Sequence, residues 1–154
     1  MPDPTRVLFV CLGNICRSPL AHALLEHKLE ERGLTDAFEV DSAGTGAYHI
    51  GERPDPRTRL VLAKHGVRSV GTARQATAED FERFDVLLAM DADNLRELRK
   101  LAPPGLADRA QLALAPTTGG EVPDPYYGGD DGFETVYGLL DEALDAWLDR
   151  WTAR

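Results

Sequence analysis

Two side chains near the start of the chain have the chemistry and the spacing to act on one bound anion. Cys11 and Arg17 are separated by five residues in the segment 11–18, which reads CLGNICRS. A cysteine thiolate is a strong nucleophile, and the planar guanidinium of an arginine binds two phosphoryl oxygens at once, which a lysine cannot match. The pair therefore predicts a nucleophilic Cys11 facing a phosphate group that Arg17 holds.

The sequence around this segment predicts a loop between a strand and a helix. Residues 7–10 (VLFV) form an apolar run of β-formers, and after the loop Ser18 can N-cap a helix with Pro19 at its first position. Successive backbone N–H groups and the helix dipole can then converge on a dianion, and the same surroundings favour the thiolate of Cys11. Gly13 and Asn14 tolerate positive φ and can turn N–H groups inward. The candidate phosphate-binding residues are Leu12, Gly13, Asn14, Ile15, Cys16, Arg17 and Ser18.

A candidate proton donor lies near the other end of the chain. Asp124 stands between two prolines in the segment 122–127, which reads VPDPYY. The prolines restrict the backbone and disfavour helix, so the carboxyl group extends from a stiff loop and can protonate a leaving oxygen. The alternative is that Asp-Pro only marks a turn. Tyr126 and Tyr127 beside it can form the walls of an aromatic pocket or pack as part of the core.

Strand patterns and helix patterns alternate along the chain, as expected for a parallel sheet covered on both faces. The predicted strands are 7–10, 38–40, 85–90 and 111–114, and the predicted helices are 18–29, 57–64, 77–84, one from Asp91 or Asp93 to 101, and 133–151 behind an Asp131–Glu134 capping pair. Between the second strand and the next helix, the glycine-containing segment 42–48 is expected to be flexible. We expect one domain, residues 1–154, with a three-layer α/β fold. In such sheets ligands bind beyond the carboxyl ends of the strands, where the loop 11–18 emerges.

Composition excludes several other classes of protein. With 17 Lys and Arg against 26 Asp and Glu, the net charge is −9, which repels nucleic acid. The N-terminal residues lack the basic and apolar pattern of a signal peptide, and no apolar run is long enough to insert into a membrane, so we expect a cytoplasmic protein. The two cysteines are too few for a disulfide scaffold, and no Cys/His group has zinc-site spacing.

Taken together, these motifs resemble one family of enzymes. The segment 10–19 (VCLGNICRSP) is similar to the signature of the low-molecular-weight protein tyrosine phosphatases, and 124–127 (DPYY) resembles their general-acid loop. The segments 41–45 (DSAGT), 54–57 (PDPR), 73–75 (ARQ) and 89–91 (AMD) also match in order, so the similarity spans nearly the whole chain. The resemblance implies a flavodoxin-like fold with a four-stranded parallel sheet, no metal or other cofactor, and a phosphocysteine intermediate.

The resemblance also implies a role for individual side chains. Cys11 is the expected nucleophile, Arg17 binds phosphate and stabilises the transition state, and Asp124 acts as acid and then as base. Ser18 is expected to hydrogen-bond the Cys11 sulfur. The further expected residues are Asn14 and Ser42 as support for the loop, and Ile15, Tyr48, Tyr126 and Tyr127 as the substrate pocket. Family members also place a histidine in the supporting network, but this chain has Gly71 at that position.

Three alternative functions use the same loop chemistry. Arsenate reductases also begin with a Cys-x5-Arg loop, but they need resolving cysteines from a distant segment, and this chain has none after Cys16. A phosphoarginine phosphatase usually carries Thr where Ile15 stands, so Ile15 favours a phosphotyrosine protein as substrate. A phosphopeptide-binding module needs the anion site but neither nucleophile nor acid. In each of these alternatives the loop 11–18 is expected to bind a phosphate-like oxyanion.

Cys16 has two open interpretations. It lies on the same loop as Cys11, so the two sulfurs can come within disulfide reach, and Cys16 can capture an oxidised Cys11 before further oxidation becomes irreversible. The alternative is that Cys16 is a small residue packed under the loop.

Overall fold

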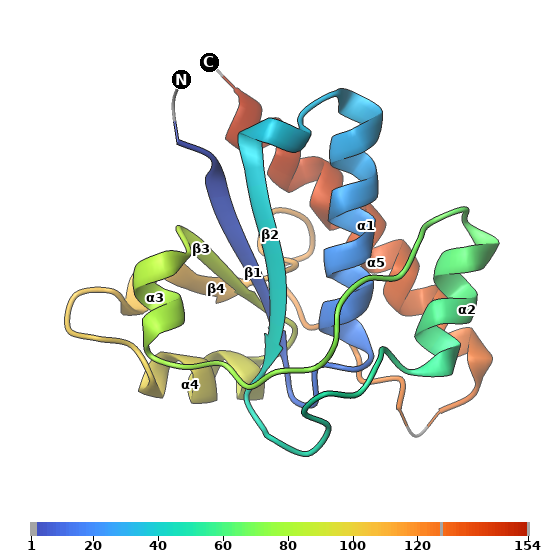
Figure 1. Ribbon diagram of the computed structural model, residues 1–154, viewed down its shortest axis with the longest axis horizontal. Coiled ribbons are helices and arrows are strands. Elements are labelled where there is room, and N and C mark those ends of the chain that lie inside the picture. The colour runs from blue at the N-terminus through green and yellow to red at the C-terminus, as the bar shows by residue number, and fades with distance from the viewer. Residues whose placement is uncertain (1–2, 127, 154) are drawn as a thin grey trace.

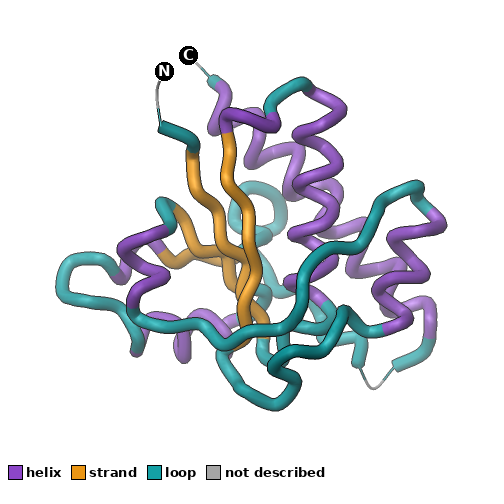
Figure 2. The backbone as a smooth tube through the Cα atoms, viewed as in Figure 1, coloured by secondary structure: helices purple, strands orange, loops and turns teal. Residues whose placement is uncertain are grey.

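A parallel β-sheet forms the middle layer of the molecule (Figures 1 and 2). The computed structural model describes residues 3–126 and 128–153, and in this part of the chain four strands form one sheet in the order β2-β1-β3-β4. The strands are β1 (Thr5–Cys11), β2 (Phe38–Gly44), β3 (Val86–Ala89) and β4 (Ala110–Leu112). β1 therefore lies inside the sheet, with a parallel neighbour on either side.

Helices cover both faces of the sheet. On one face lie α1 (Arg17–Arg32), α2 (Pro56–Lys64) and α5 (Asp130–Thr152), and on the other α3 (Glu79–Arg83) and α4 (Ala92–Lys100). Two short 3₁₀ helices, η1 (Thr35–Ala37) and η2 (Ala107–Arg109), precede β2 and β4. The predicted three-layer α/β fold is confirmed.

Side chains of β1 alternate between two hydrophobic cores. Val7 and Phe9 pack with residues of α1, α2 and α5, whereas Leu8 and Val10 pack with residues of α3 and α4. All four side chains are fully buried. A strand buried on both faces must be apolar at successive positions, which explains the unbroken run in the sequence.

Pairing with β1 extends β2 beyond its predicted end. The predicted strand stops at Val40, but β2 continues to Gly44, which lies opposite Cys11 in the register. The expectation that residues 42–44 are flexible was therefore wrong, because hydrogen bonding to β1 fixes them. Parallel pairing thus brings the end of β2 beside the start of the 11–18 loop.

The start of a helix was predicted correctly for α4 and wrongly for α1 and α5. Asp91 is the N-cap of α4 and accepts a hydrogen bond from the backbone N of Asn94. α1 begins at Arg17 without a side-chain cap, and Ser18 lies in its first turn. α5 begins at Asp130 after Gly129, so Asp131 lies inside the helix and the predicted capping pair was wrong.

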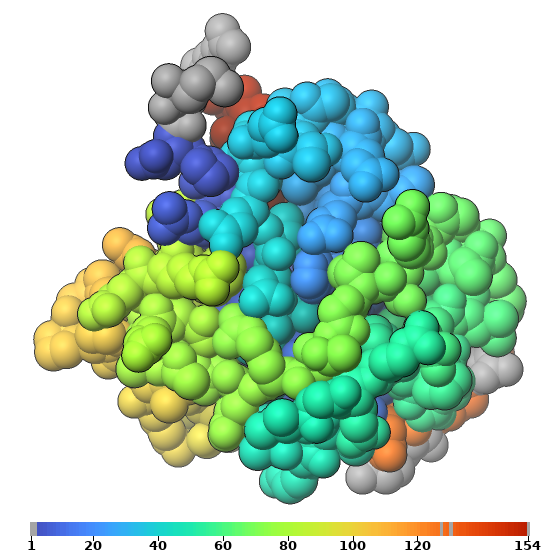
Figure 3. Space-filling model, viewed as in Figure 1, coloured from blue at the N-terminus to red at the C-terminus, as the bar shows by residue number. Residues whose placement is uncertain are grey.

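The loops that follow the strands gather at one end of the sheet. The long segment between β2 and α3, teal to green in Figures 1 and 3, wraps across the end at which β1 and β2 finish. The segment leading into α5 reaches the same end of the molecule (Figure 1). Among the described residues, no helix is both long and apolar enough to cross a membrane.

Candidate active site

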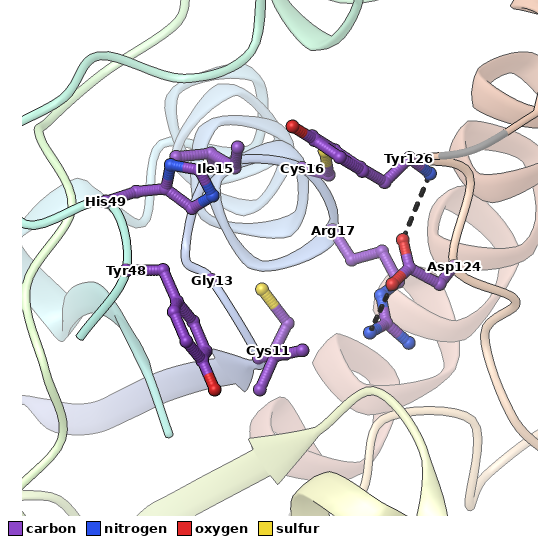
Figure 4. A pocket seen from close by; sticks show the side chains of 10 residues that line it. Cys11, Gly13, Ile15, Cys16, Arg17, Tyr48, His49, Asp124 and Tyr126 are labelled. Atoms are coloured by element: carbon purple, nitrogen blue, oxygen red, sulfur yellow. Dashed lines mark hydrogen bonds and ion pairs between the residues drawn. The ribbon is translucent and has the colours of Figure 1, made fainter. Parts of the chain in front are cut away.

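A pocket of about 420 Å³ opens at the carboxyl end of β1. Three separate segments line it: the loop after β1, the turn after β2 and the loop before α5 (Figure 4). The lining residues are Cys11, Leu12, Gly13, Ile15, Cys16, Arg17, Tyr48, His49, Asp124 and Tyr126. The fold thus brings the predicted nucleophile, the predicted phosphate ligand and the predicted acid into one cavity.

The sulfur of Cys11 lies among hydrogen-bonding groups inside this pocket. Its Sγ accepts a hydrogen bond from the backbone N of Asn14 at 3.3 Å and lies 2.9 Å from Oγ of Ser18. Ser18 Oγ accepts a hydrogen bond from Nδ2 of Asn14 at 2.8 Å, and its own proton can go to the sulfur or to the carbonyl of Ala43 at 3.4 Å. Cys11 is 3% exposed. The backbone N–H of Asn14 and the hydroxyl of Ser18 are thus the polar groups that face the sulfur.

Asn14 connects this loop to the rest of the sheet end. It adopts a left-handed backbone conformation with φ 56°, which turns its N–H toward the sulfur. Its Oδ1 accepts a hydrogen bond from the backbone N of Arg74 at 3.0 Å. The Arg74 guanidinium in turn binds Asp41 and Asp80, so an ion-pair cluster holds the residue that supports Asn14.

Ser42 and Gly71 lie beside a histidine that the sequence analysis did not assign to the site. The Ser42 hydroxyl is 3.3 Å from Nδ1 of His22, and Nε2 of His22 is 3.0 Å from Glu26. A Cβ built on Gly71 would lie 3.9 Å from the ring of His22, which is buried. The hydrogen bond of the Ser42 side chain is therefore made to α1 and not to the 11–18 loop.

Arg17 is fixed by partners that come from distant parts of the chain. Its side chain is 3% exposed, and its NH1 donates to Oδ2 of Asp91 at 2.7 Å and to the carbonyl of Val122 at 2.9 Å. NH2 lies 3.7 Å from Oδ2 of Asp124. Sequence analysis gave Asp91 as a candidate helix start and as part of the 89–91 segment, but assigned it no role in the site. The available signal was its place directly after β3, a strand that borders β1 in the parallel sheet.

Asp124 lies at the edge of the pocket on the loop before α5. Its side chain is 43% exposed, and its Oδ1 accepts a hydrogen bond from the backbone N of Tyr126 at 3.0 Å. Tyr126 and Tyr48 both line the pocket, and their side chains are partly or largely exposed (Figure 4). Tyr127, the remaining predicted pocket residue, lies outside the described residues.

Gly13 and His49 meet at the mouth of the pocket. A Cβ built on Gly13 would lie 3.0 Å from Cδ2 of His49, so a side chain at this position would crowd the ring. Gly13 is thus needed for space, whereas Asn14 supplies the positive φ of the loop. Nδ1 of His49 is 2.7 Å from Oε2 of Glu52, which holds the ring in this place.

The two cysteines of the loop have different surroundings. Both are free and buried. Burial, together with the charges of Asp55, Cys11 and Asp124, raises the pKa of Cys16 to about 12. Cys16 is therefore a thiol at neutral pH, whereas the Cys11 sulfur lies within hydrogen-bonding distance of the Asn14 N–H and the Ser18 hydroxyl.

The described residues contain no group of three or more His, Cys, Asp or Glu side chains placed to hold a metal ion. The polar groups that line the pocket include an arginine, a carboxyl group and the sulfur of Cys11 with the groups around it. Such a set can bind a tetrahedral oxyanion and transfer a proton to one of its substituents.

Comparison with known proteins agrees with this chemistry. A family described as "Low molecular weight phosphotyrosine protein phosphatase" matches residues 6–154. A protein of that name from Schizosaccharomyces pombe is 48% identical over 143 residues, covering 89% of this chain and 90% of the relative. A low molecular weight protein-tyrosine-phosphatase from Streptomyces coelicolor is 48% identical, covering 93% and 91%. A crystal structure of a protein tyrosine phosphatase from Entamoeba histolytica superposes with a TM-score of 0.92 at 38% identity, covering 96% of each chain.

Proposed function

We propose a mechanism for this chain, which belongs to the low molecular weight phosphotyrosine protein phosphatase family and is a protein-tyrosine phosphatase. Cys11 attacks the phosphorus of a phosphotyrosine side chain, and the phosphoryl group passes through a phosphocysteine to water. The observation that carries this mechanism is the Cys11 sulfur inside the pocket, held by donors from Asn14 and Ser18, with Arg17 and Asp124 beside it.

Arg17 and the loop backbone bind the phosphate in this mechanism. The guanidinium is already oriented by Asp91 and Val122, so little side-chain freedom is lost when it meets the equatorial oxygens. Asp91 also balances the buried charge of Arg17 before substrate arrives. Backbone N–H groups of residues 12–17, next to the start of α1, supply further donors to the dianion.

Two chemical steps follow. In the first, the Cys11 thiolate forms a bond to phosphorus while the bond from phosphorus to the tyrosine oxygen breaks, and Asp124 gives its proton to that oxygen. In the second, Asp124 takes a proton from a water molecule whose oxygen bonds to phosphorus, while the bond from sulfur to phosphorus breaks. The products are tyrosine, inorganic phosphate and the Cys11 thiolate, which the Ser18 hydroxyl stabilises as the leaving group.

Pocket depth supports phosphotyrosine as the substrate. Cys11 is 3% exposed, whereas Tyr48 at the rim is 74% exposed, so the phosphate must reach past the rim to the sulfur. In the proposed complex the phenyl ring of phosphotyrosine lies beside Tyr48 and Tyr126 while its phosphate meets Cys11, and the shorter phosphoserine side chain would place its phosphate less deeply.

The first test measures turnover of p-nitrophenyl phosphate with EDTA present. We expect full activity in the parent and none in Cys11→Ser, while Cys11→Ser still binds inorganic phosphate. Peptides of one sequence carrying phosphotyrosine, phosphoserine or phosphoarginine identify the substrate class. Preference for phosphotyrosine is expected, and a preference for either of the other peptides contradicts the assignment.

A series of phenyl phosphates tests Asp124. Leaving groups as basic as tyrosine, with a pKa of about 10, need a proton in the transition state, whereas p-nitrophenolate does not. Asp124→Asn should therefore lower kcat/KM by about 10²-fold or more for phenyl phosphate and far less for p-nitrophenyl phosphate. Equal losses across the series would mean that Asp124 has only a structural role.

A further inference from the structure

The start of α2 is attached to the loop that carries Cys11. The backbone N of Asp55, the N-cap of α2, donates to the carbonyl of Ile15 at 2.7 Å. Thr58 Oγ1, one turn further along the helix, donates to the carbonyl of Cys16 at 3.2 Å. Both donors are buried. The first turn of α2 therefore has a fixed position relative to the nucleophile.

One side chain of this turn reaches from there to the loop that carries Asp124. Nε and NH2 of Arg57 donate to the two carboxylate oxygens of Asp55, each at 3.1 Å. Its guanidinium carbon lies 5.5 Å from the centre of the Tyr126 ring and 4.7 Å from that of Phe133, and NH1 donates to the carbonyl of Gly128 at 3.4 Å. Figure 1 shows α2 beside the start of α5, where this contact is made.

Tyr126, which Arg57 contacts, is hydrogen-bonded to the predicted acid, Asp124. The backbone N of Tyr126 donates to Oδ1 of Asp124 at 3.0 Å, so the position of Tyr126 fixes one oxygen of the carboxyl group. The other oxygen is the one near Arg17. Prolines restrict the loop at residues 123 and 125, and Arg57 holds it from the outside.

We propose that Arg57 is a positioning residue that holds the Asp124 loop at the distance from Cys11 at which the carboxyl group can protonate the leaving oxygen. The inference rests on the general-acid role of Asp124 proposed above. Arginine suits this task because one planar group can pair with both oxygens of Asp55 and lie on aromatic rings at the same time. Lysine has the charge but neither the fork nor the flat surface.

The ion pair that anchors Arg57 is strong enough to reverse the effect of burial on Asp55. Burial alone raises the pKa of the Asp55 carboxyl group, but hydrogen bonds from the side chain and backbone of Arg57 outweigh it and hold the pKa below its ordinary value. Asp55 is therefore a carboxylate at neutral pH, and Arg57 has a charged partner there.

Leaving-group dependence tests this role, because a loss of packing affects all aryl phosphates alike. In Arg57→Met, we expect kcat/KM for phenyl phosphate to fall about tenfold, while that for p-nitrophenyl phosphate falls less than about twofold. Arg57→Lys should behave like Arg57→Met. Lys64→Met is the matched control, since it removes one positive charge from the last turn of the same helix and should match the parent.

The double variant Arg57→Met/Asp124→Asn separates this proposal from the mechanism on which it rests. If Arg57 acts through Asp124, the double variant is no slower on phenyl phosphate than Asp124→Asn alone. Three results would overturn the positioning role. They are a double variant whose loss is the product of the two single losses, an Arg57→Met variant with equal losses on both substrates, and full activity in Arg57→Lys. If Asp124 is not the general acid, the result is different: Asp124→Asn then loses the same share of kcat/KM on phenyl phosphate as on p-nitrophenyl phosphate.

Discussion

Replacing Asp91 with asparagine tests whether this carboxylate holds Arg17 in place. Oδ2 of Asp91 accepts from Arg17 at 2.7 Å, and Oδ1 caps α4 through the N–H of Asn94 at 2.7 Å. Asparagine is as good an N-cap as aspartate, so the variant keeps the cap and loses mainly the charge that faces the guanidinium. Arg17 then retains the Val122 carbonyl and, at 3.7 Å, the half-exposed carboxylate of Asp124, but it loses the carboxylate of Asp91 at 2.7 Å.

The expected loss of stability follows from the burial of this ion pair. Removing one partner of a buried pair costs roughly 3–5 kcal/mol, and because Asp91 is 21% exposed we expect the lower end, about 3 kcal/mol. In a chain of 154 residues this corresponds to a fall in Tm of about 6–12 °C. The activity should fall as well, because a guanidinium that is free to move binds the equatorial oxygens less well.

Thermal unfolding and kcat/KM for p-nitrophenyl phosphate measure the two effects on the same samples. Asp93→Asn is the matched control, because Asp93 lies in the first turn of the same helix, is 80% exposed and pairs with Arg96 at the surface. Its effect on stability should stay within about 0.5 kcal/mol. If Asp91→Asn unfolds at the same temperature as Asp93→Asn and keeps its activity, Asp91 does not hold Arg17.

Further predictions concern the loop itself. Arg17→Lys should lose nearly all turnover of p-nitrophenyl phosphate, because a point charge cannot bind two oxygens in one plane. Near-normal activity would contradict the proposal that Arg17 binds two phosphoryl oxygens at once. Ser18→Ala should lower kcat and leave KM nearly unchanged, since the hydroxyl lies 2.9 Å from the Cys11 sulfur and stabilises it as the leaving group; a pure KM effect would point to substrate binding instead. Peroxide should convert the Cys11 thiolate to a sulfenic acid, which the Cys16 sulfur captures with loss of water to form a disulfide. With the pKa of Cys16 raised to about 12, crosslinking seen by peptide mass should quicken as pH rises from neutral, and Cys16→Ala should lose activity irreversibly. Full rescue of Cys16→Ala by added thiol would make Cys16 a packing residue only.

Features that depend on neighbouring residues could be predicted from the sequence. The apolar run of β1 predicted a buried strand, and of the two predicted starts of α4, Asp91 and Asp93, Asp91 is the N-cap. The strand–loop–helix order then placed Cys11 and Arg17 in one loop. A prediction from the local sequence fails where a side chain has a competing partner. Ser18 was predicted to cap α1, but its hydroxyl contacts the Cys11 sulfur.

Contacts between distant segments could not be predicted in this way. Arg17 and Asp91 are 74 residues apart, and Arg57 and Gly128 are 71 apart, so no local spacing joins them. The buried contact between His22 and Ser42 likewise needs α1 to lie against β2. Only the packing of the layers decides which polar groups meet at the carboxyl end of the sheet.

The central claim is that the phosphoryl group is carried on Cys11. Acid quenching during turnover of p-nitrophenyl phosphate, followed by peptide mass analysis, measures this directly in the parent and in Asp124→Asn, where slower attack by water should allow the intermediate to accumulate. We expect one phosphoryl group on Cys11 and none on Cys16, together with a burst of one p-nitrophenolate per enzyme molecule. Turnover without a phosphoenzyme, or with the phosphoryl group on another residue, would contradict the mechanism.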